Sequence, residues 1–132
     1  MKKILILIPV FNDWESLKKL LLEVNENVSN LKGIHFECLV VNDSSTIEQP
    51  NLTRPSNIKS FEILNMKENR GHARCNAFGI RHVFQKKDFD YLILMDGDGE
   101  DRPIEIKSLI EAINKKPTVS AVAKRVKRSE GP

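Results

Sequence analysis

The chain has 132 residues, of which 40% are hydrophobic, 30% charged and 6% aromatic, and this composition excludes disordered and fibrous proteins. A chain of this length buries about two-thirds of its unfolded surface, so we expect one domain over residues 1–132. Apolar runs fall short of the roughly 18 residues that span a bilayer, and the net charge of +3 is too small to indicate nucleic-acid binding.

Stretches of β-branched residues and leucine alternate with segments of helical periodicity along the chain. The predicted strands cover residues 4–10, 36–41, 61–64, 91–95 and 119–123. Helices are predicted from residue 12 or 13 to Gly33, after Gly71, and from Pro103 onward, whereas the proline-containing segment 46–57 is predicted to be a loop. This alternation predicts an α/β layer fold with a mostly parallel sheet.

The first two helices carry the clearest patterns. In the first, Asn12 as N-cap and Glu15 three residues later have the form of a capping box. Its apolar stripe consists of Trp14, Leu17, Leu20, Leu21, Val24, Val28 and Leu31. We expect Trp14 to pack this helix onto the sheet rather than to stack on a base. The second helix carries on one apolar side Ala73, Ala77, Ile80, Val83 and Phe84.

Three polar clusters follow predicted strands, at Phe11–Asp13, Asn42–Ser45 and Asp96–Asp98. Each cluster by itself is also typical of an ordinary turn, because Asn, Asp, Gly and Ser favour turns. The carboxyl ends of parallel strands meet at one edge of a sheet, where ligands bind in open α/β folds. The shared position of the clusters therefore favours a binding site at this edge.

Asp96 and Asp98 are two like charges one residue apart, an arrangement that needs a cation or hydrogen-bond donors nearby. Mg²⁺ and Mn²⁺ take oxygen ligands and often share them with phosphates, so the pattern favours a metal site, with an exposed acidic turn as the alternative. The basic segment Lys124–Arg128 suits phosphate groups, although a solvated chain end has the same composition. Cys38 and Cys75 lack metal-type spacing and fit reduced thiols.

Four segments match, in order, the motifs of one enzyme family. Ile8–Asp13 is similar to I-P-x-Y-N-E, Val40–Ser45 to V-V-D-D-G-S, Asn69–Ile80 to N-x-G-x-A-x-x-x-G, and Asp96–Pro103 to D-A-D-L-Q-D-P-P. The chain therefore resembles the amino-terminal part of a family 2 glycosyltransferase of the GT-A fold, with the polyprenyl-phosphate (dolichol-phosphate mannose synthase-like) branch as the closer likeness. The resemblance implies a three-layer α/β sandwich with a mostly parallel sheet. It also implies metal-assisted transfer of a sugar from a UDP- or GDP-linked donor to a polyprenyl phosphate or a saccharide acceptor.

Roles for individual residues are implied by this resemblance alone. The residues implied to bind the donor are Pro9, Phe11, Asp13, Val41, Asp43, Asp96, Gly97, Asp98 and Arg125, with Arg128 as a second phosphate-facing candidate. Asp98 and Glu100 are implied to ligate Mg²⁺ or Mn²⁺. The sequence departs from the family pattern with Phe11 for Tyr, Asp13 for Glu and Asn42 for Asp, which leaves the identity of the donor open.

Family members usually continue past this point, so the chain resembles a truncated donor-binding part. A non-catalytic donor-binding fragment or an interaction remnant of the same fold is the alternative to an active enzyme. A dehalogenase-like phosphatase, a receiver domain and a dinucleotide-binding module fit the order of the motifs less well, and the last lacks its glycine-rich loop. The resemblance implies a role in making cell-envelope polysaccharide or glycolipid, in the cytoplasm or peripherally at the inner face of the membrane. We expect no nucleic-acid partner, and an uncovered sheet edge would allow a homo-oligomer.

Overall fold

The computed structural model describes residues 2–67, 72–86, 88–95 and 123–125. The elements, in chain order, are β1 (Lys2–Val10), α1 (Trp14–Val28), β2 (Ile34–Asn42), β3 (Ser60–Asn65), α2 (His72–Lys86), β4 (Tyr91–Leu94) and β5 (Ala123–Arg125). The helix predicted from Pro103 and residues 119–122 of the predicted last strand lie outside the described residues. The loop predicted over 46–57 is confirmed, because no helix or strand occurs there.

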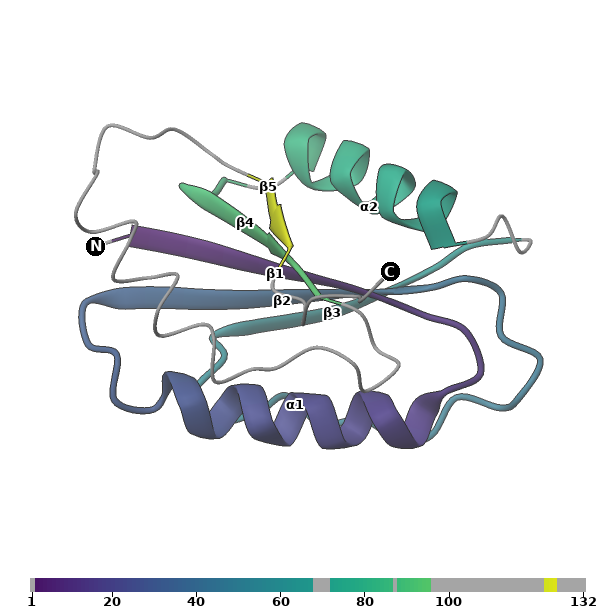
Figure 1. Cartoon of the computed structure of the whole chain (residues 1–132), viewed down its shortest axis with the longest axis horizontal. Helices are drawn as coiled ribbons and strands as arrows, with labels where there is room; N and C mark the ends of the chain where they lie inside the picture. The colour runs from purple at the N-terminus through teal and green to yellow at the C-terminus, as the bar shows by residue number, and fades with distance from the viewer. Residues whose placement is uncertain (1, 68–71, 87, 96–122, 126–132) are drawn as a thin grey trace, which may run out of the picture.

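The described strands form one sheet in the order β3-β2-β1-β4-β5, and every neighbouring pair is parallel. The helix α1 covers one face of this sheet and α2 covers the other, so the fold has three layers (Figure 1). The prediction of an α/β layer fold with a parallel sheet is therefore confirmed. Because all of these strands point the same way, their carboxyl ends lie along a single edge.

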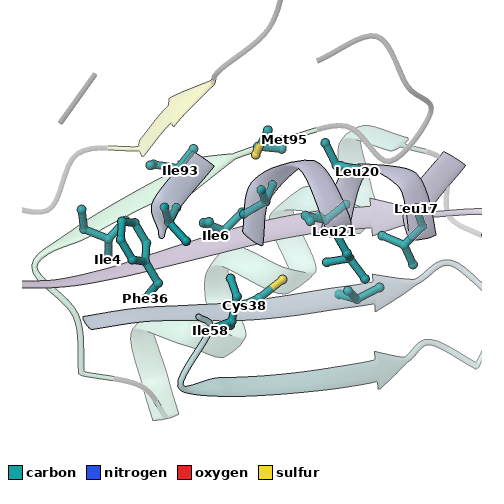
Figure 2. Packing of buried hydrophobic residues seen from close by; sticks show 14 of the residues in the cluster. Ile4, Ile6, Leu17, Leu20, Leu21, Phe36, Cys38, Ile58, Ile93 and Met95 are labelled. Atoms are coloured by element: carbon teal, nitrogen blue, oxygen red, sulfur yellow. The ribbon is translucent and has the colours of Figure 1, made fainter. Parts of the chain in front are cut away.

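The sheet divides the buried side chains into two clusters, because successive residues of a strand point to opposite faces. On the α1 face, the even-numbered residues of β1 pack against the helix, and Figure 2 shows Ile4 and Ile6 in the same cluster as Leu17, Leu20 and Leu21. The odd-numbered Leu5 and Leu7 belong to the smaller cluster on the α2 face. Burial of each such aliphatic side chain contributes about 1.5–3 kcal/mol.

The apolar stripe predicted for the first helix is confirmed, but its predicted ends are wrong. The buried residues of α1 are Trp14, Leu17, Leu20, Leu21, Val24 and Val28. The N-cap is Asp13 rather than Asn12, and no side chain caps the helix, so the predicted capping box does not form. The helix ends at Val28, and Gly33, with a φ of 77°, lies in the turn that leads to β2.

The apolar side predicted for the second helix is confirmed for Val83 and the half-buried Ile80, and it is wrong for Ala77 and Phe84. Ala77 and Phe84 are exposed, and the residues that face the sheet are Cys75, Gly79 and Val83, with Ile80 half-buried. A side chain at position 79 would place its Cβ 2.8 Å from Cδ1 of Leu7 and 2.9 Å from Cγ2 of Val41. The helix therefore approaches the sheet most closely where it has no side chain, and the larger residues turn outward. Phe84 instead packs edge-on against Phe89, with 5.2 Å between ring centroids.

Candidate functional site

The polar clusters that follow β1 and β2 lie side by side at the carboxyl edge of the sheet. The amide of Asp43 donates a hydrogen bond of 2.8 Å to the carbonyl of Val10, which joins the two strand ends. The amide of Met66 donates to the carbonyl of Asn42 at 2.9 Å, which adds the end of β3 to the same edge. The first two predicted clusters thus occupy one edge, as their positions after parallel strands predicted.

Asn12 connects the loop after β1 to the loop after β2. Its Oδ1 accepts hydrogen bonds from the amides of Thr46 at 2.7 Å and Ile47 at 2.8 Å. Its own amide donates to Oγ of Ser45 at 2.8 Å, and its Nδ2 donates to Oγ1 of Thr46 at 3.0 Å. Trp14 adds a further link, since its Nε1 donates to the carbonyl of Ile47 at 3.1 Å. The two loops are therefore held together as one unit.

The backbone at both strand ends is strained. Asn12 has a φ of 63° and Ser44 has a φ of 57°, which lie in the left-handed region that residues other than glycine rarely adopt. Each such residue costs on the order of 1 kcal/mol or more, and residues of this kind concentrate at functional sites. The left-handed turn at Asn12 also closes a tight hydrogen bond of 2.8 Å from the amide of Asp13 to the carbonyl of Phe11. The hydrogen bonds of Asn12 offset this strain and fix the direction in which its two neighbours leave the sheet.

Among the residues that the structure describes, Asp43 is a charged residue that is nonetheless buried, with 4% of its surface exposed. It follows β2 and lies close to Cys75 of α2, where burial and then the Asp43 carboxylate raise the pKa of the Cys75 thiol to about 12. The thiol is neutral at physiological pH and donates to the carbonyl of Val41 at 3.6 Å. The carboxylate of Asp43 therefore lies near the contact between the end of β2 and α2.

Asn42 explains one departure from the family motif. Its Nδ2 donates to Oδ1 of Asn65 at 2.9 Å, and its Oδ1 accepts from the amide of Ser45 at 3.0 Å. A carboxylate at this position would keep the bond from Ser45 but would have no proton to donate to Asn65. The amide thus joins the end of β2 to the end of β3. Asn65 was not among the predicted site residues, although its position directly after the third predicted strand would have identified it.

The predicted donor-binding residues that the structure describes fall into two groups. Phe11 is 46% exposed and Asp13 is exposed at the start of α1, so both side chains are accessible from the carboxyl edge. Pro9 and Val41 are buried, and Val41 belongs to the cluster beneath α2. Pro9 and Val41 therefore form the floor below this edge rather than part of its accessible surface.

The later site residues are described only in part. Asp96, Gly97, Asp98, Glu100 and Arg128 lie outside the described residues. Met95, which precedes Asp96, is buried, and its amide donates to the carbonyl of Leu7 at 3.0 Å. Arg125 was predicted to follow the last strand. It belongs instead to β5 and lies in register with Leu94 of β4, because the described strand occupies 123–125.

Neither a metal centre nor a membrane span occurs in the described part of the chain. Within residues 2–67, 72–86, 88–95 and 123–125, the His, Cys, Asp and Glu side chains form no group of three or more that could hold a metal ion. The described residues alone therefore do not fit a metal site, and the predicted ligands Asp98 and Glu100 lie beyond them. The described helices also lack the length and apolar character needed to cross a membrane.

The two cysteines have the form that the sequence predicted. Both are free and buried, and burial raises the pKa of the Cys38 thiol, like that of Cys75, to about 12. Of the histidines, His35 bonds Glu37 at 2.8 Å on the same strand, and His82 lies 3.8 Å from Glu62. These pairs belong to the sheet and to α2, away from the loops at the carboxyl edge.

A parallel α/β sheet with a helix on each face is typical of the doubly wound class, in which ligands bind at the carboxyl ends of the strands. The family model for glycosyl transferase family 2 matches residues 5–132, so the chain belongs to that family. Among curated proteins, it is 29% identical over 113 residues to the undecaprenyl-phosphate 4-deoxy-4-formamido-L-arabinose transferase of Klebsiella pneumoniae (strain 342). The matched part is 83% of this chain and 33% of that relative, so the chain spans about a third of its length.

Proposed function

We propose that this chain is the donor-binding part of a glycosyltransferase that moves a sugar from a UDP- or GDP-linked donor to a polyprenyl phosphate. The observation that carries the proposal is the unit that Asn12 builds at the carboxyl edge, which keeps Phe11 and Asp13 beside Asp43 in a chain of family 2. A saccharide acceptor would suit the same donor site. The polyprenyl phosphate is preferred because the relative from Klebsiella pneumoniae is named as an undecaprenyl-phosphate transferase.

Exposed Phe11 and buried Asp43 fit different parts of a nucleoside. The ring of Phe11 is 46% exposed and offers an aromatic face for a base. The carboxylate of Asp43 is acceptor-only, so it suits the N–H groups of a base or the hydroxyls of a ribose. Asp13 is exposed at the start of α1, and Pro9 and Val41 are buried below this edge.

The remaining roles rest on the match of residues 96–103 and 125 to the family motifs. Asp96 and Gly97 would contact the nucleoside, and Arg125 would pair with a phosphate of the donor or the lipid. Asp98 and Glu100 would hold Mg²⁺ or Mn²⁺, whose chemistry when bound is to neutralise the charge of the leaving diphosphate. A phosphate acceptor is already ionised at neutral pH, so its attack needs little help from a general base.

The proposal also covers the organisation and location of the protein. Residues 1–132 would fold as one donor-binding domain, and its acceptor would be met in the cytoplasm or at the inner face of the membrane. The product would enter cell-envelope polysaccharide or glycolipid. Self-association would use β3, one of the two edge strands of the described sheet.

The test is calorimetric titration of the chain with UDP, GDP, CDP and ADP, each with and without Mn²⁺. We expect UDP or GDP to bind, and Mn²⁺ to strengthen the binding. Asp43→Asn should weaken that binding by about tenfold or more, because it removes a buried charged acceptor. Asp88→Asn is the matched control, since its side chain is 93% exposed and pairs with Lys3 near the start of β1. If none of the diphosphates binds under any metal condition, the proposal is wrong.

A further inference from the structure

A groove of about 840 Å³ lies between the end of β3 and the outer face of α2. Its lining residues are Asn65, Met66, Lys67, Arg74, Ala77, Phe78 and Arg81. The α2 members are spaced by three, four and seven residues, so they form one stripe along the helix. This stripe is the side of α2 that turns outward because Gly79 and Val83 face the sheet. Among the residues that the structure describes, none of the predicted donor-binding residues lines this groove.

The described lining of the groove carries a net positive charge. Lys67, Arg74 and Arg81 supply three cations, and its described lining contains no acidic side chain. Within the part of the chain that the structure describes, none of these three residues forms an ion pair or a side-chain hydrogen bond. The nearby carboxylate of Glu62 already lies 3.8 Å from His82. Three like charges around one cavity repel one another, and an anion bound between them would relieve that repulsion.

The groove also has an apolar wall. Phe78 is 39% exposed and lies on the helix between Arg74 and Arg81, with Ala77 beside it and Met66 on the β3 side. Arg74 and Arg81 are seven positions apart, which corresponds to about 10 Å along a helix. A fitting ligand therefore carries negative charge over several ångströms and has an apolar part.

A phosphate ester fits these charges better than a single carboxylate. Arginine pairs with phosphate through two parallel hydrogen bonds, and a phosphate or diphosphate carries enough charge to meet more than one cation. A lone carboxylate would leave two of the three cations without a counter-charge. The exposed ring of Phe78 suits the apolar portion of such an ester.

We propose that this groove is a second ligand site, which binds a phosphate-bearing group through Lys67, Arg74 and Arg81 and an attached apolar part through Phe78. The phosphate comes from a lipid headgroup or from a soluble phosphate ester, which share this chemistry. The groove shares Asn65 and Met66 with the carboxyl edge, but Asp43 and Phe11 are not part of its lining, so its charge does not depend on the proposed donor contacts.

The experiment measures binding of two probes to the full chain and to a double variant. Pyrophosphate is titrated calorimetrically, and vesicles of phosphatidylcholine with or without phosphatidic acid are tested by co-sedimentation. Arg74→Gln together with Arg81→Gln should weaken binding of at least one probe by about tenfold or more, since it removes two charge-assisted contacts. Lys19→Gln together with Lys32→Gln is the matched control, because it removes the same charge from exposed residues elsewhere on the surface. Circular dichroism and thermal unfolding verify that both variants fold.

The outcomes separate the two sources of phosphate. Pyrophosphate binding that only the arginine variant loses identifies a soluble ester. Binding to phosphatidic acid vesicles that only this variant loses identifies a lipid headgroup, and Phe78→Ala should then weaken vesicle binding as well. The proposal is overturned if both double variants bind like the parent chain or if the parent binds neither probe. Asp43→Asn should leave this binding unchanged. Failure of the groove proposal can therefore be distinguished from failure of the proposed donor site.

Discussion

The two faces of the sheet are covered in different ways. The helix α1 packs through large aliphatic side chains and Trp14, which is 4% exposed. The helix α2 packs through Cys75, Gly79 and Val83, so its backbone lies closer to the strands. The α1 face accordingly holds most of the buried apolar surface. The α2 face holds the buried Asp43–Cys75 contact and the cationic groove. The comparison indicates that α1 mainly stabilises the fold, whereas α2 shapes the surfaces on which ligands would bind.

The largest effect should come from removing a large side chain on the α1 face. Leu17→Ala is expected to lower the free energy of unfolding by about 2–5 kcal/mol, because Leu17 is completely buried and its loss leaves a cavity. Urea denaturation measures the change. Leu22→Ala on the same helix is the control, since Leu22 is 68% exposed and its substitution should change stability by about 0.5 kcal/mol or less. Equal costs for the two variants would contradict the assignment of α1 to the core.

The α2 face should instead be sensitive to added volume. Gly79→Val is expected to destabilise the chain by about 1–3 kcal/mol, because even its Cβ would lie 2.8 Å from Leu7 and 2.9 Å from Val41, which are both fully buried. Ala77→Val is the control on the exposed side of the same helix. It introduces the same β-branched residue and should cost about 0.7 kcal/mol or less. A Gly79→Val variant as stable as Ala77→Val would show that the helix does not approach the sheet so closely.

The contrast between the faces also separates what the sequence predicted from what it did not. The α1 stripe was predictable because its large apolar residues repeat at helical spacing. The contact face of α2 was not, because the space at Gly79 is set by Leu7 and Val41, which come from two strands far away in the chain. The same reasoning explains why Cys75 was not expected to face the sheet.

The candidate site shows the same division between local and long-range information. Its location at the carboxyl edge followed from the order of the elements and the parallel sheet. The role of Asn12 did not, because the capping box competes with hydrogen bonds to Thr46 and Ile47, and these residues are 34 and 35 positions away. Likewise, no local pattern brings Lys67 together with Arg74 and Arg81 around one groove.

A smaller effect should follow from breaking the link between the two loops. Asn12→Ala is expected to lower stability by about 1 kcal/mol, since it removes the acceptor of two exposed amides and places alanine in the left-handed region. Hydrogen exchange at Thr46 and Ile47 should become faster. Asn12→Asp keeps an acceptor oxygen and tolerates this backbone conformation, so it should retain most of the protection. Unchanged exchange in Asn12→Ala would contradict the link.

The last effect concerns the buried thiols and appears only in alkaline solution. The pKa of Cys38 and of Cys75 rises from an ordinary value of 9.0 to about 12 on folding, chiefly through burial. Below about pH 9 both folded and unfolded chains hold the protons, so the contribution to stability is complete. Between about pH 9 and 12 the unfolded chain loses protons that the folded chain keeps, so the free energy of unfolding should fall as the pH rises. Urea denaturation at a series of alkaline pH values measures this slope.

Cys38→Ala should reduce the slope, and adding Cys75→Ala to the same chain should reduce it further. Asp43→Asn should alter it only slightly, because the carboxylate is the lesser cause of the shift at Cys75. A slope that Asp43→Asn removes while both thiols remain would mean that charge, rather than burial, keeps these groups protonated.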